Sequence, residues 1–145
     1  SVEMALRADQ GQVFAVEKKD DAVALLYKNK QRFAADNLEI IKGEAPEALK
    51  ELPVPTHAFI GGSSGNLKEI VALLLEKNRD VRIVINCITL ETISEALEIL
   101  KEFDFADQEA VQLTASRSKE IGRYHLMMGE NPIYIITCQS PRAQI

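Results

Sequence analysis

FIGGSSGNL, residues 59–67, joins an apolar strand to an amphipathic helix through a turn of glycine and serine. Glycines at the end of a strand let the backbone approach a ligand closely, and the N-terminus of the next helix presents unpaired N–H groups. A plain connector needs one glycine, whereas this turn has Gly61, Gly62 and Gly65. We interpret it as a small-molecule binding loop, with a simple strand-to-helix connector as the alternative. The loop lacks the lysine of a P-loop.

Strands and helices alternate on both sides of this turn. Apolar and β-branched runs predict strands over residues 12–16, 38–41, 57–60 and 81–85. Helical spacing of apolar residues predicts a helix over residues 20–33, a second one beginning at Leu67 and a third one after Thr89. The order predicts an α/β, Rossmann-like three-layer sandwich with a mainly parallel sheet.

The C-terminal part does not continue the alternation of strands and helices. Residues 109–117 and 132–138 read as two successive strands without a helix between them, which predicts an antiparallel pair at one edge of the sheet. We expect residues 1–139 to form the domain and residues 140–145 to form a tail.

Several local details follow from the same pattern. Asp20 or Asp21 is available to cap the first of these helices, and Pro46 is expected to start a short helix at residues 47–49. The helix from Leu67 shows one apolar face, and the helix after Thr89 is expected to bury four residues. These four are Ile93, Ala96, Leu97 and Leu100. Residues 52–55, which contain two prolines, read as a rigid linker.

Size and composition limit the possible functions. The chain has 145 residues, of which 46% are hydrophobic and 27% charged, as expected for one globular domain. A net charge of −5 without a clustered basic face argues against nucleic acid or anionic membrane partners. The sequence shows no membrane span or signal peptide, so we expect a soluble, cytoplasmic protein. Cys87 and Cys138 lack metal-ligand spacing, and we expect buried thiols and no metal site.

The start of the chain departs from a complete doubly wound sheet. Residues 1–6 read as the middle of a helix with no strand before it. Such a sheet normally opens with a strand and a glycine-rich turn that contacts the ligand. We therefore expect that residues carrying the first strand and this turn are missing from the sequence.

Two segments near strand ends are candidates for contacts with a nucleoside cofactor. Glu17 follows an apolar strand, where an acid can accept both ribose hydroxyls, although it can also be a surface carboxylate beside Lys18 and Lys19. Residues 43–46, Gly-Glu-Ala-Pro, follow the next strand and can either hydrogen-bond an adenine ring or simply start a helix. Both interpretations of this second segment stay open.

Further polar residues are expected at the same edge. Asn86 ends a buried strand, and Thr89 can either face a ligand or cap the helix that follows it. No nucleophile-elbow sequence accompanies either histidine, and acid–base chemistry by Glu17 or Glu91 stays open. An edge hairpin could fold over a substrate and contribute a small group of side chains. This group consists of Arg117, Tyr124, His125 and Asn131.

Five segments together resemble the decarboxylating precorrin methyltransferase family of cobalamin biosynthesis. They are VFAVEKKDDAV, GEAP, AFIGGSSGNLKEI, INCITLETI and NPIYIIT. The resemblance implies a class I S-adenosylmethionine-dependent methyltransferase that methylates carbon 15 of a corrin precursor and promotes loss of carboxylate from a ring acetate. The family occurs as a separate protein or as the C-terminal half of a fused enzyme that also methylates carbon 5. Relatives suggest a homo-oligomer, a tetramer.

The resemblance also implies roles for individual residues but names no catalytic one. Binding of S-adenosylmethionine is implied for Glu17 through the ribose, for its neighbour Lys18, for Glu44 and Ala45 at the adenine-side turn, and for Gly61. Binding of the tetrapyrrole is implied for Gly62, Ser63, Ser64, Gly65, Asn66, Asn86 and Thr89. Ser64 stands where relatives often carry glycine. The family's first strand and GxGxGS-like loop are absent from the sequence.

Other functions are compatible with parts of this pattern. The fold hosts methyltransferases that act on RNA, protein or other small molecules, because fold alone does not fix function. A non-catalytic tetrapyrrole-binding or oligomerisation module would not need the missing loop. A nicotinamide-dependent oxidoreductase would need a GxGxxG turn, which the sequence does not contain.

Overall fold

The computed structural model describes residues 1–62 and 65–141. The contacts within the chain form two compact units, Ser1–Pro53 and Val54–Ile145. The boundary between them falls inside the segment that the sequence predicts to be a linker, residues 52–55. Each unit is described below by itself.

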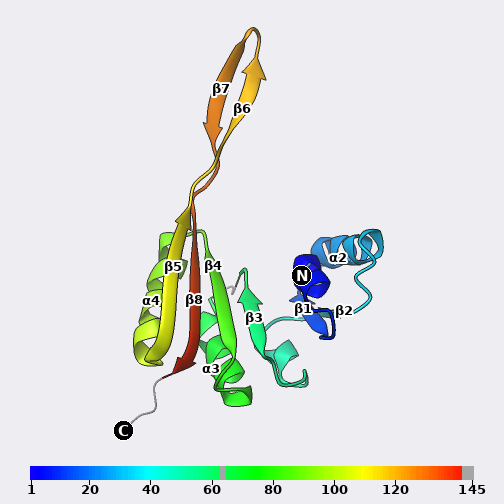
Figure 1. Cartoon of the computed structure of the whole chain (residues 1–145), viewed down its shortest axis with the longest axis vertical. Helices are drawn as coiled ribbons and strands as arrows, with labels where there is room; N and C mark the ends of the chain where they lie inside the picture. Colours follow the sequence, from blue (N-terminus) through cyan, green and yellow to red (C-terminus); the bar gives the residue numbers. More distant parts are fainter. Residues whose placement is uncertain (63–64, 142–145) are drawn as a thin grey trace. The chain divides into compact units, whose positions relative to one another are not determined.

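The first unit is built around two parallel strands (blue to cyan in Figure 1). Its elements are α1 (Val2–Arg7), β1 (Val13–Glu17), α2 (Asp20–Arg32), β2 (Leu38–Lys42) and the 3₁₀ helix η1 (Glu47–Leu49). The register runs from Val13 opposite Leu38 to Glu17 opposite Lys42, so both strands end at the same edge. A small core of Ala5, Val13, Ala15, Ala35 and Leu38 holds the unit together.

The side-chain amide of Asn37 ties the first unit together. Its Nδ2 lies 3.0 Å from the carbonyl oxygen of Ala5, 2.9 Å from that of Ala8 and 3.0 Å from that of Gly11. These bonds add a donor to carbonyl groups at and after the C-terminus of α1, two of which also accept a backbone N–H from the following turn. They fix α1 beside the start of β2.

Helix α2 differs from the sequence-based expectation at its N-terminus. Its N-cap residue is Lys19, whereas Asp20 and Asp21 lie in the first turn, so the predicted aspartate cap is wrong. The two carboxylates still carry the charge that a helix N-terminus favours. Leu26 packs against the core of this unit, and Tyr27 is exposed.

The second unit contains a four-stranded mixed sheet in the order β3-β4-β8-β5. Its elements are β3 (His57–Ile60), α3 (Leu67–Lys77), β4 (Arg82–Cys87), α4 (Leu90–Glu102), β5 (Phe105–Leu113) and β8 (Ile133–Pro141). β3 and β4 are parallel, and β8 is antiparallel to both β4 and β5. The predicted antiparallel pair exists, but β8 lies inside the sheet between β4 and β5, and β5 forms the edge.

The two helices α3 and α4 supply most of the core of the second unit. Leu67, Ile70, Val71 and Leu74 are buried, as the sequence predicts for α3. In α4 the buried residues are Ala96, Ile99 and Leu100. Leu97 is 45% exposed, so its predicted burial is wrong. The buried stripe of α4 is rotated toward Ile99, which lies on the same helical face as Ala96.

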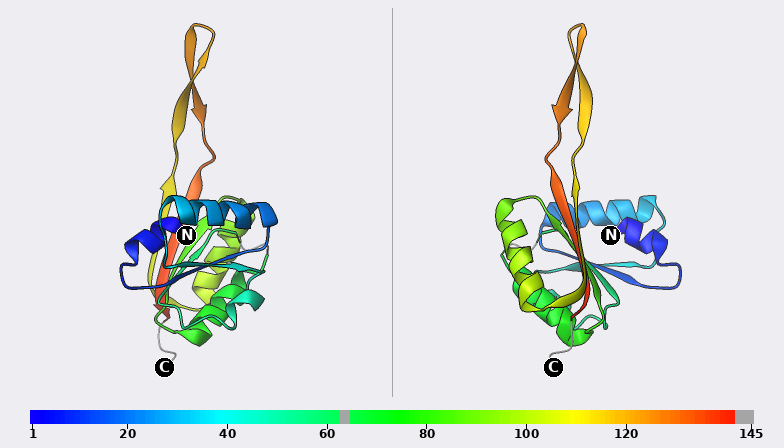
Figure 2. Two further views of the ribbon diagram at one scale, coloured as in Figure 1. Left: turned by 90° about the vertical axis from the view of Figure 1, so that its right-hand side faces the viewer. Right: turned by 60° about the vertical axis from the view of Figure 1, so that its left-hand side comes forward.

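A two-stranded arm extends from this sheet (Figures 1 and 2). It consists of β6 (Ser116–Ile121) and β7 (Tyr124–Gly129), which pair in antiparallel register from Ser116 opposite Gly129 to Ile121 opposite Tyr124. Gly122 makes the turn with φ +62°, and the N–H of Glu130 donates to the carbonyl of Ala115 at 2.9 Å. Every residue from 106 to 132 is exposed.

The arm corrects two expectations for the C-terminal part. The strand predicted over residues 109–117 begins earlier, at Phe105, and ends at Leu113. Strand β8 continues to Pro141, past residue 139, at which we expected the domain to end. The rest of the expected tail, residues 142–145, lies outside the described residues. Over the described ranges, no helix is long and apolar enough to cross a membrane.

Candidate ligand-binding site

The first unit brings three of the predicted cofactor residues together at the end of β1. The N–H of Lys19 donates to Oε1 of Glu17 at 2.9 Å, and the N–H of Gly43 donates to the carbonyl oxygen of Glu17 at 3.0 Å. Nζ of Lys18 lies 2.9 Å from Oε1 of Glu44. Glu17, Lys18 and Glu44 therefore lie side by side at the carboxyl edge of the parallel pair, where open α/β sheets bind ligands.

The turn after β2 has a structural role of its own. A Cβ atom added to Gly43 would lie 2.8 Å from Cβ of Ala48, which is too close for two carbon atoms. The N–H of Ala48 donates to the carbonyl of Glu44 at 2.9 Å, which brings η1 back over the turn. Ala45 precedes Pro46 in this turn. The close packing of this turn against η1 explains why residue 43 is a glycine. The side chain of Glu44 lies at the ligand-facing edge.

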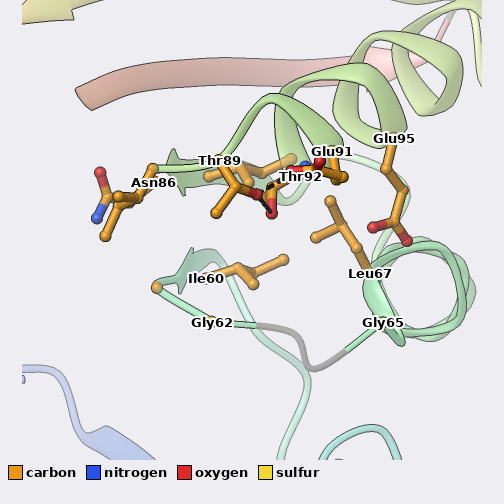
Figure 3. A pocket seen from close by; sticks show the side chains of 12 residues that line it. Ile60, Gly62, Gly65, Leu67, Asn86, Thr89, Glu91, Thr92 and Glu95 are labelled. Atoms are coloured by element: carbon orange, nitrogen blue, oxygen red, sulfur yellow. Dashed lines mark hydrogen bonds between the residues drawn. The ribbon is translucent and has the colours of Figure 1, made fainter. Parts of the chain in front are cut away.

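The second unit contains a pocket of about 360 Å³ at the carboxyl ends of β3 and β4 (Figure 3). Five of the predicted ligand residues line it: Gly61, Gly62, Gly65, Asn86 and Thr89. The rest of the described lining consists of Ile60, Leu67, Ile85, Ile88, Glu91, Thr92 and Glu95. In Figure 3, Asn86, Thr89 and Thr92 lie on one side of the pocket and Ile60 and Gly62 on the other.

Three other predicted residues of the loop do not belong to the described lining. Asn66 is the N-cap residue of α3, and its side chain makes no capping hydrogen bond. Ser63 and Ser64 lie outside the described residues. The loop's contribution to the pocket is therefore described only for its glycines.

The reason why glycine is suited to its position differs among the three glycines of the loop. Gly65 has φ +87°, a conformation that other residues rarely adopt. A Cβ atom on Gly61 would lie 3.2 Å from Cε1 of Phe59. A Cβ atom on Gly62 would meet nothing within 4 Å among the described residues. Packing thus accounts for Gly61 and backbone geometry for Gly65, whereas at Gly62 neither reason applies and the missing side chain leaves open space at the pocket.

Asn86 carries a buried acceptor without a partner. It lies on β4, which continues one residue further to Cys87, so the prediction that Asn86 ends the strand is off by one position. Its Oδ1 is buried and has no hydrogen-bond partner in the described structure. A buried unpaired carbonyl oxygen costs about 1–3 kcal/mol. A ligand that donates an N–H or O–H group to this oxygen would recover that cost.

Thr89 caps helix α4, as one of its two interpretations predicts. The N–H of Thr92 donates to Oγ1 of Thr89 at 3.2 Å, and the two hydroxyl oxygens are 3.0 Å apart. Thr92 stands where a complete capping box would have an acid, so the reciprocal bond to the N-cap backbone is replaced by a bond between hydroxyls. Thr89 is also exposed at the pocket, so the capping role and a ligand contact coexist.

The sequence did not predict that Thr92 and Glu95 line the pocket, and it gave no position for Glu91. All three follow the N-cap Thr89 at helical spacing on one side of α4, and this spacing is the signal that would have found them. The described lining contains two carboxylates and no lysine, arginine or histidine. The pocket therefore disfavours the carboxylate groups of a ligand on this side and favours apolar or hydrogen-bond-donating groups.

The residues predicted on a hairpin over the substrate lie elsewhere. Arg117, Tyr124 and His125 are on the exposed arm, and Asn131 follows it. The arm extends beyond the sheet instead of folding back onto it (Figure 2). None of these four residues belongs to the described lining of the pocket, so their contact with a substrate stays a prediction.

Both cysteines are buried free thiols, as predicted. Burial raises the pKa of Cys138 to about 11. Burial, and then the nearby carboxylate of Glu95, also raises the pKa of Cys87. Both side chains are therefore neutral near pH 7 and pack as small apolar groups.

Residues 1–139 match the protein family described as "Precorrin methyltransferase domain". The chain is 37% identical over 139 residues to a probable cobalt-precorrin-6B C(15)-methyltransferase (decarboxylating) of Pyrobaculum calidifontis, covering 94% of this chain and 71% of that protein. It is 33% identical over 140 residues to the cobalt-precorrin-6B C(15)-methyltransferase (decarboxylating) of Salmonella typhimurium, covering 96% and 72%.

Solved structures give the same grouping. The chain superposes on a precorrin-6y C5,15-methyltransferase from Geobacter metallireducens with a TM-score of 0.86 and 31% identity, covering 96% of this chain and 74% of the other. An S-adenosylmethionine-dependent O-methyltransferase from Thermotoga maritima has a TM-score of 0.70 at 18% identity, covering 93% and 52%, and shares the fold alone.

Proposed function

Because the chain belongs to the precorrin methyltransferase domain family, we propose that it methylates carbon 15 of a corrin precursor and promotes decarboxylation of a ring acetate in cobalamin biosynthesis. The fold is that of a class I methyltransferase, as the sequence predicts. The family match over residues 1–139 carries the proposal, because its relatives are named for this reaction.

The proposal assigns the methyl donor S-adenosylmethionine to the edge formed by β1 and β2. Glu17 suits the ribose hydroxyls, because the N–H of Lys19 already orients its carboxylate from one side. Glu44 and Ala45 form the adenine-side turn, and the bond from Lys18 to Glu44 keeps that turn close to Glu17. Gly61 is the fifth residue assigned to this ligand. When bound, S-adenosylmethionine supplies an electrophilic methyl group.

The tetrapyrrole is assigned to the pocket of the second unit. Gly62 leaves room for a flat ligand, and Gly65 and Asn66 lead into α3. Ser63 and Ser64 are assigned to the same ligand from the family resemblance alone. Oδ1 of Asn86 is a hydrogen-bond acceptor for a pyrrole N–H group.

The acidic lining refines this assignment. Glu91 and Glu95 repel the acetate and propionate groups of a precorrin, so these groups would lie outside the pocket. The apolar side chains of Ile60, Ile85 and Ile88 match its carbon skeleton. Thr89 holds the start of α4 in place beside it. Reactions of this type depend chiefly on alignment and exclusion of water, and these residues provide both.

The same proposal includes the remaining properties that the sequence predicts. These are a domain that extends to the end of β8, a cytoplasmic location, no nucleic acid or membrane partner, and a homo-oligomer, which the family resemblance implies to be a tetramer. Association or fusion with a carbon 5 methyltransferase domain belongs to the same expectation.

The direct test combines a product assay with a binding assay. The protein is incubated with S-adenosylmethionine labelled in its methyl group and with a corrin precursor that lacks the carbon 15 methyl. Mass spectrometry is expected to show a product that has gained one labelled methyl and lost one carbon dioxide. Nuclear magnetic resonance would place the label on carbon 15. Calorimetry measures S-adenosylmethionine binding separately from turnover.

Matched variants at Asn86 sharpen this test. Asn86→Leu removes the acceptor and should abolish tetrapyrrole turnover while leaving S-adenosylmethionine binding within about twofold. Asn78→Leu, at the C-cap of α3, controls for the loss of a half-buried asparagine that does not line the pocket. Asn78 donates to the carbonyl of Pro55 at 2.8 Å and accepts from the N–H of Asp80 at 3.0 Å, so this control is expected to lose stability but to keep its turnover. Binding without turnover of any corrin precursor would favour a non-catalytic tetrapyrrole-binding module instead.

A further inference from the structure

The acidic side of the pocket carries a carboxylate whose proton chemistry the proposed function leaves unused. Glu91 and Glu95 both line the pocket from α4, one helical turn apart. Glu91 is exposed, whereas Glu95 is partly buried beside the fully buried Ala96. In Figure 3, the side chain of Glu95 points from α4 toward Leu67 and Gly65 at the start of α3. The carboxylate of Glu95 is therefore the more sheltered of the two.

No basic side chain neutralises Glu95 within the described part of the chain. Its carboxylate makes no hydrogen bond or ion pair there, and the described lining contains no lysine, arginine or histidine. Lys68, in the first turn of α3, pairs with Glu102 at 2.8 Å instead. Burial, and then the charge of Glu95, raises the pKa of the Cys87 thiol at the end of β4. An unpaired carboxylate in this position can accept a proton and donate it again.

The position of Asn86 indicates which part of a tetrapyrrole would reach Glu95. In Figure 3, Asn86 and Glu95 lie at opposite ends of the labelled lining. The pocket volume of about 360 Å³ is near the lower end of the range of about 300–1,000 Å³ for small-molecule sites, so the pocket encloses one edge of a four-ring macrocycle. A pyrrole N–H held by Oδ1 of Asn86 would place this edge across the pocket, with ring and bridging carbons toward Glu95.

The proposed reaction moves a proton within the substrate. A bridging carbon without a methyl group carries a hydrogen, so methyl transfer leaves carbon 15 with both a hydrogen and a methyl group and leaves a positive charge on the macrocycle. When the acetate loses carbon dioxide, the electron pair of the broken C–C bond enters the conjugated ring, cancels this charge and leaves a methylene group. Restoring conjugation at carbon 15 requires removal of its hydrogen, and converting the methylene into a methyl group requires a proton. The two requirements balance without another reactant.

We propose that Glu95 is the catalytic residue that carries this proton. This inference rests on the proposed function. The carboxylate of Glu95 accepts the proton from carbon 15 and donates it to the methylene carbon, so the protein ends the reaction in the protonation state in which it began. Repulsion by Glu95 turns the carboxylate of the acetate away before it is lost. Carbon dioxide then departs on the far side, and the methylene carbon stays open to Glu95.

Glu95→Gln tests this role, because glutamine keeps the size of the side chain but cannot carry the proton. In a single turnover, incorporation of labelled methyl into the tetrapyrrole should stay within about threefold of the unchanged chain. Formation of the final product should slow at least about 100-fold, the lower end of what acid–base catalysis contributes. The variant should accumulate a compound of the same mass as the product that has a methylene group and a hydrogen on carbon 15. Nuclear magnetic resonance identifies both features during the turnover.

Two further variants control for charge and for structure. Glu98→Gln removes an exposed carboxylate of α4 outside the described lining and should form the final product at the rate of the unchanged chain. Glu95→Asp keeps a carboxylate on a shorter side chain and should form the final product at least about tenfold faster than Glu95→Gln. The melting temperature of Glu95→Gln should stay within a few degrees of that of the unchanged chain, and its affinity for S-adenosylmethionine within about twofold.

Different results would overturn the proton transfer and the proposed function. Glu95 is not the proton carrier if Glu95→Gln forms the final product at the rate of the unchanged chain, or if only Glu91→Gln accumulates the methylene compound. Equal slowing of methyl incorporation and of product formation would mean that Glu95 positions the substrate, which also overturns the proposal. An unchanged chain that transfers no label to a corrin precursor would refute the proposed function itself.

Discussion

The hydroxyl oxygen of Thr89 lies 3.0 Å from that of Thr92 and also accepts a hydrogen bond from the Thr92 N–H at 3.2 Å. This cap fixes the first turn of α4, on which Thr92 and Glu91 face the pocket. The geometry of one side of the pocket therefore depends on a helix cap.

Replacing Thr89 by alanine should destabilise the protein by about 1 kcal/mol, because the N–H of Thr92 loses its acceptor. Urea unfolding measures the change as a lower midpoint with an unchanged slope. Thr89→Ser keeps the acceptor and should stay within about 0.5 kcal/mol of the unchanged protein. Equal losses in both variants would show that the methyl group of Thr89, and not its hydroxyl, stabilises the helix.

Gly62→Leu should abolish tetrapyrrole turnover while leaving the fold intact. A Cβ atom at this position meets no described atom within 4 Å, so the backbone can carry a side chain there, and its outer atoms would take up pocket space. The melting temperature should stay within a few degrees, and the methylation assay should show no product. A graded loss in Gly62→Ala would support a steric cause. Full turnover in the leucine variant would mean that the loop only connects β3 to α3.

Glu17→Ala should weaken S-adenosylmethionine binding by about 1–3 kcal/mol, the typical cost of losing hydrogen bonds to a charged group. Calorimetry measures the dissociation constant. Glu39→Ala is the matched control, since Glu39 is a carboxylate on β2 that accepts a hydrogen bond from Gln12 at 3.1 Å, away from the ligand-facing edge. An unchanged affinity in the Glu17 variant would remove this residue from the cofactor site.

Gly43→Ala should lower the free energy of unfolding by about 1–3 kcal/mol, because overpacking forces neighbouring backbone to move. Its new Cβ would lie 2.8 Å from Cβ of Ala48. Adding Ala48→Gly removes that contact and should recover part of the loss, although glycine costs about 0.5–1 kcal/mol in a helical turn. Thermal unfolding of the three variants compares them. No recovery in the combined variant would rule out the clash as the cause.

Cys138 should make stability fall in alkaline solution. Its folded pKa is raised from 9.0 to about 11 by burial, so the folded state keeps the proton after the unfolded state has lost it. The stability it contributes is present below pH 9 and is lost as the pH rises toward 11. Cys138→Ala should show a shallower decline of unfolding free energy over this interval, even if it is less stable throughout. Parallel declines in both proteins would contradict the shifted pKa.

The sequence predicted the parts of the fold that depend on local patterns. The strand ending at Ile60 and the buried face of α3 that begins at Leu67 follow from the periodicity of apolar residues, and the structure confirms both. The position of β8 between β4 and β5 was not predictable, because a strand pattern fixes neither pairing partner nor direction. Strands β6 and β7 were missed because SRSKEI has no alternation of apolar and polar residues.

The candidate site shows the same division. Gly62, Asn86 and Thr89 were found because they follow strand ends or precede a helix. The unpaired state of Asn86 Oδ1 depends on how neighbouring elements pack and has no sequence signal. Glu95 lies one helical turn after Glu91 and contributes to the pocket. This position could be predicted only once the first residue of α4 was known from its cap.

The placement of β8 has a consequence for biosynthesis. Among the described strands, β8 leaves the ribosome last, yet it is an interior strand that pairs on one side with β4 and on the other with β5. Until β8, Ile133–Pro141, has been synthesised, no strand joins β4 to β5, and the apolar side chains of both strands stay exposed to solvent. The sheet can therefore close only after β8 has been synthesised, and a chain that stops before Ile133 would be recognised by chaperones and proteases as incompletely folded.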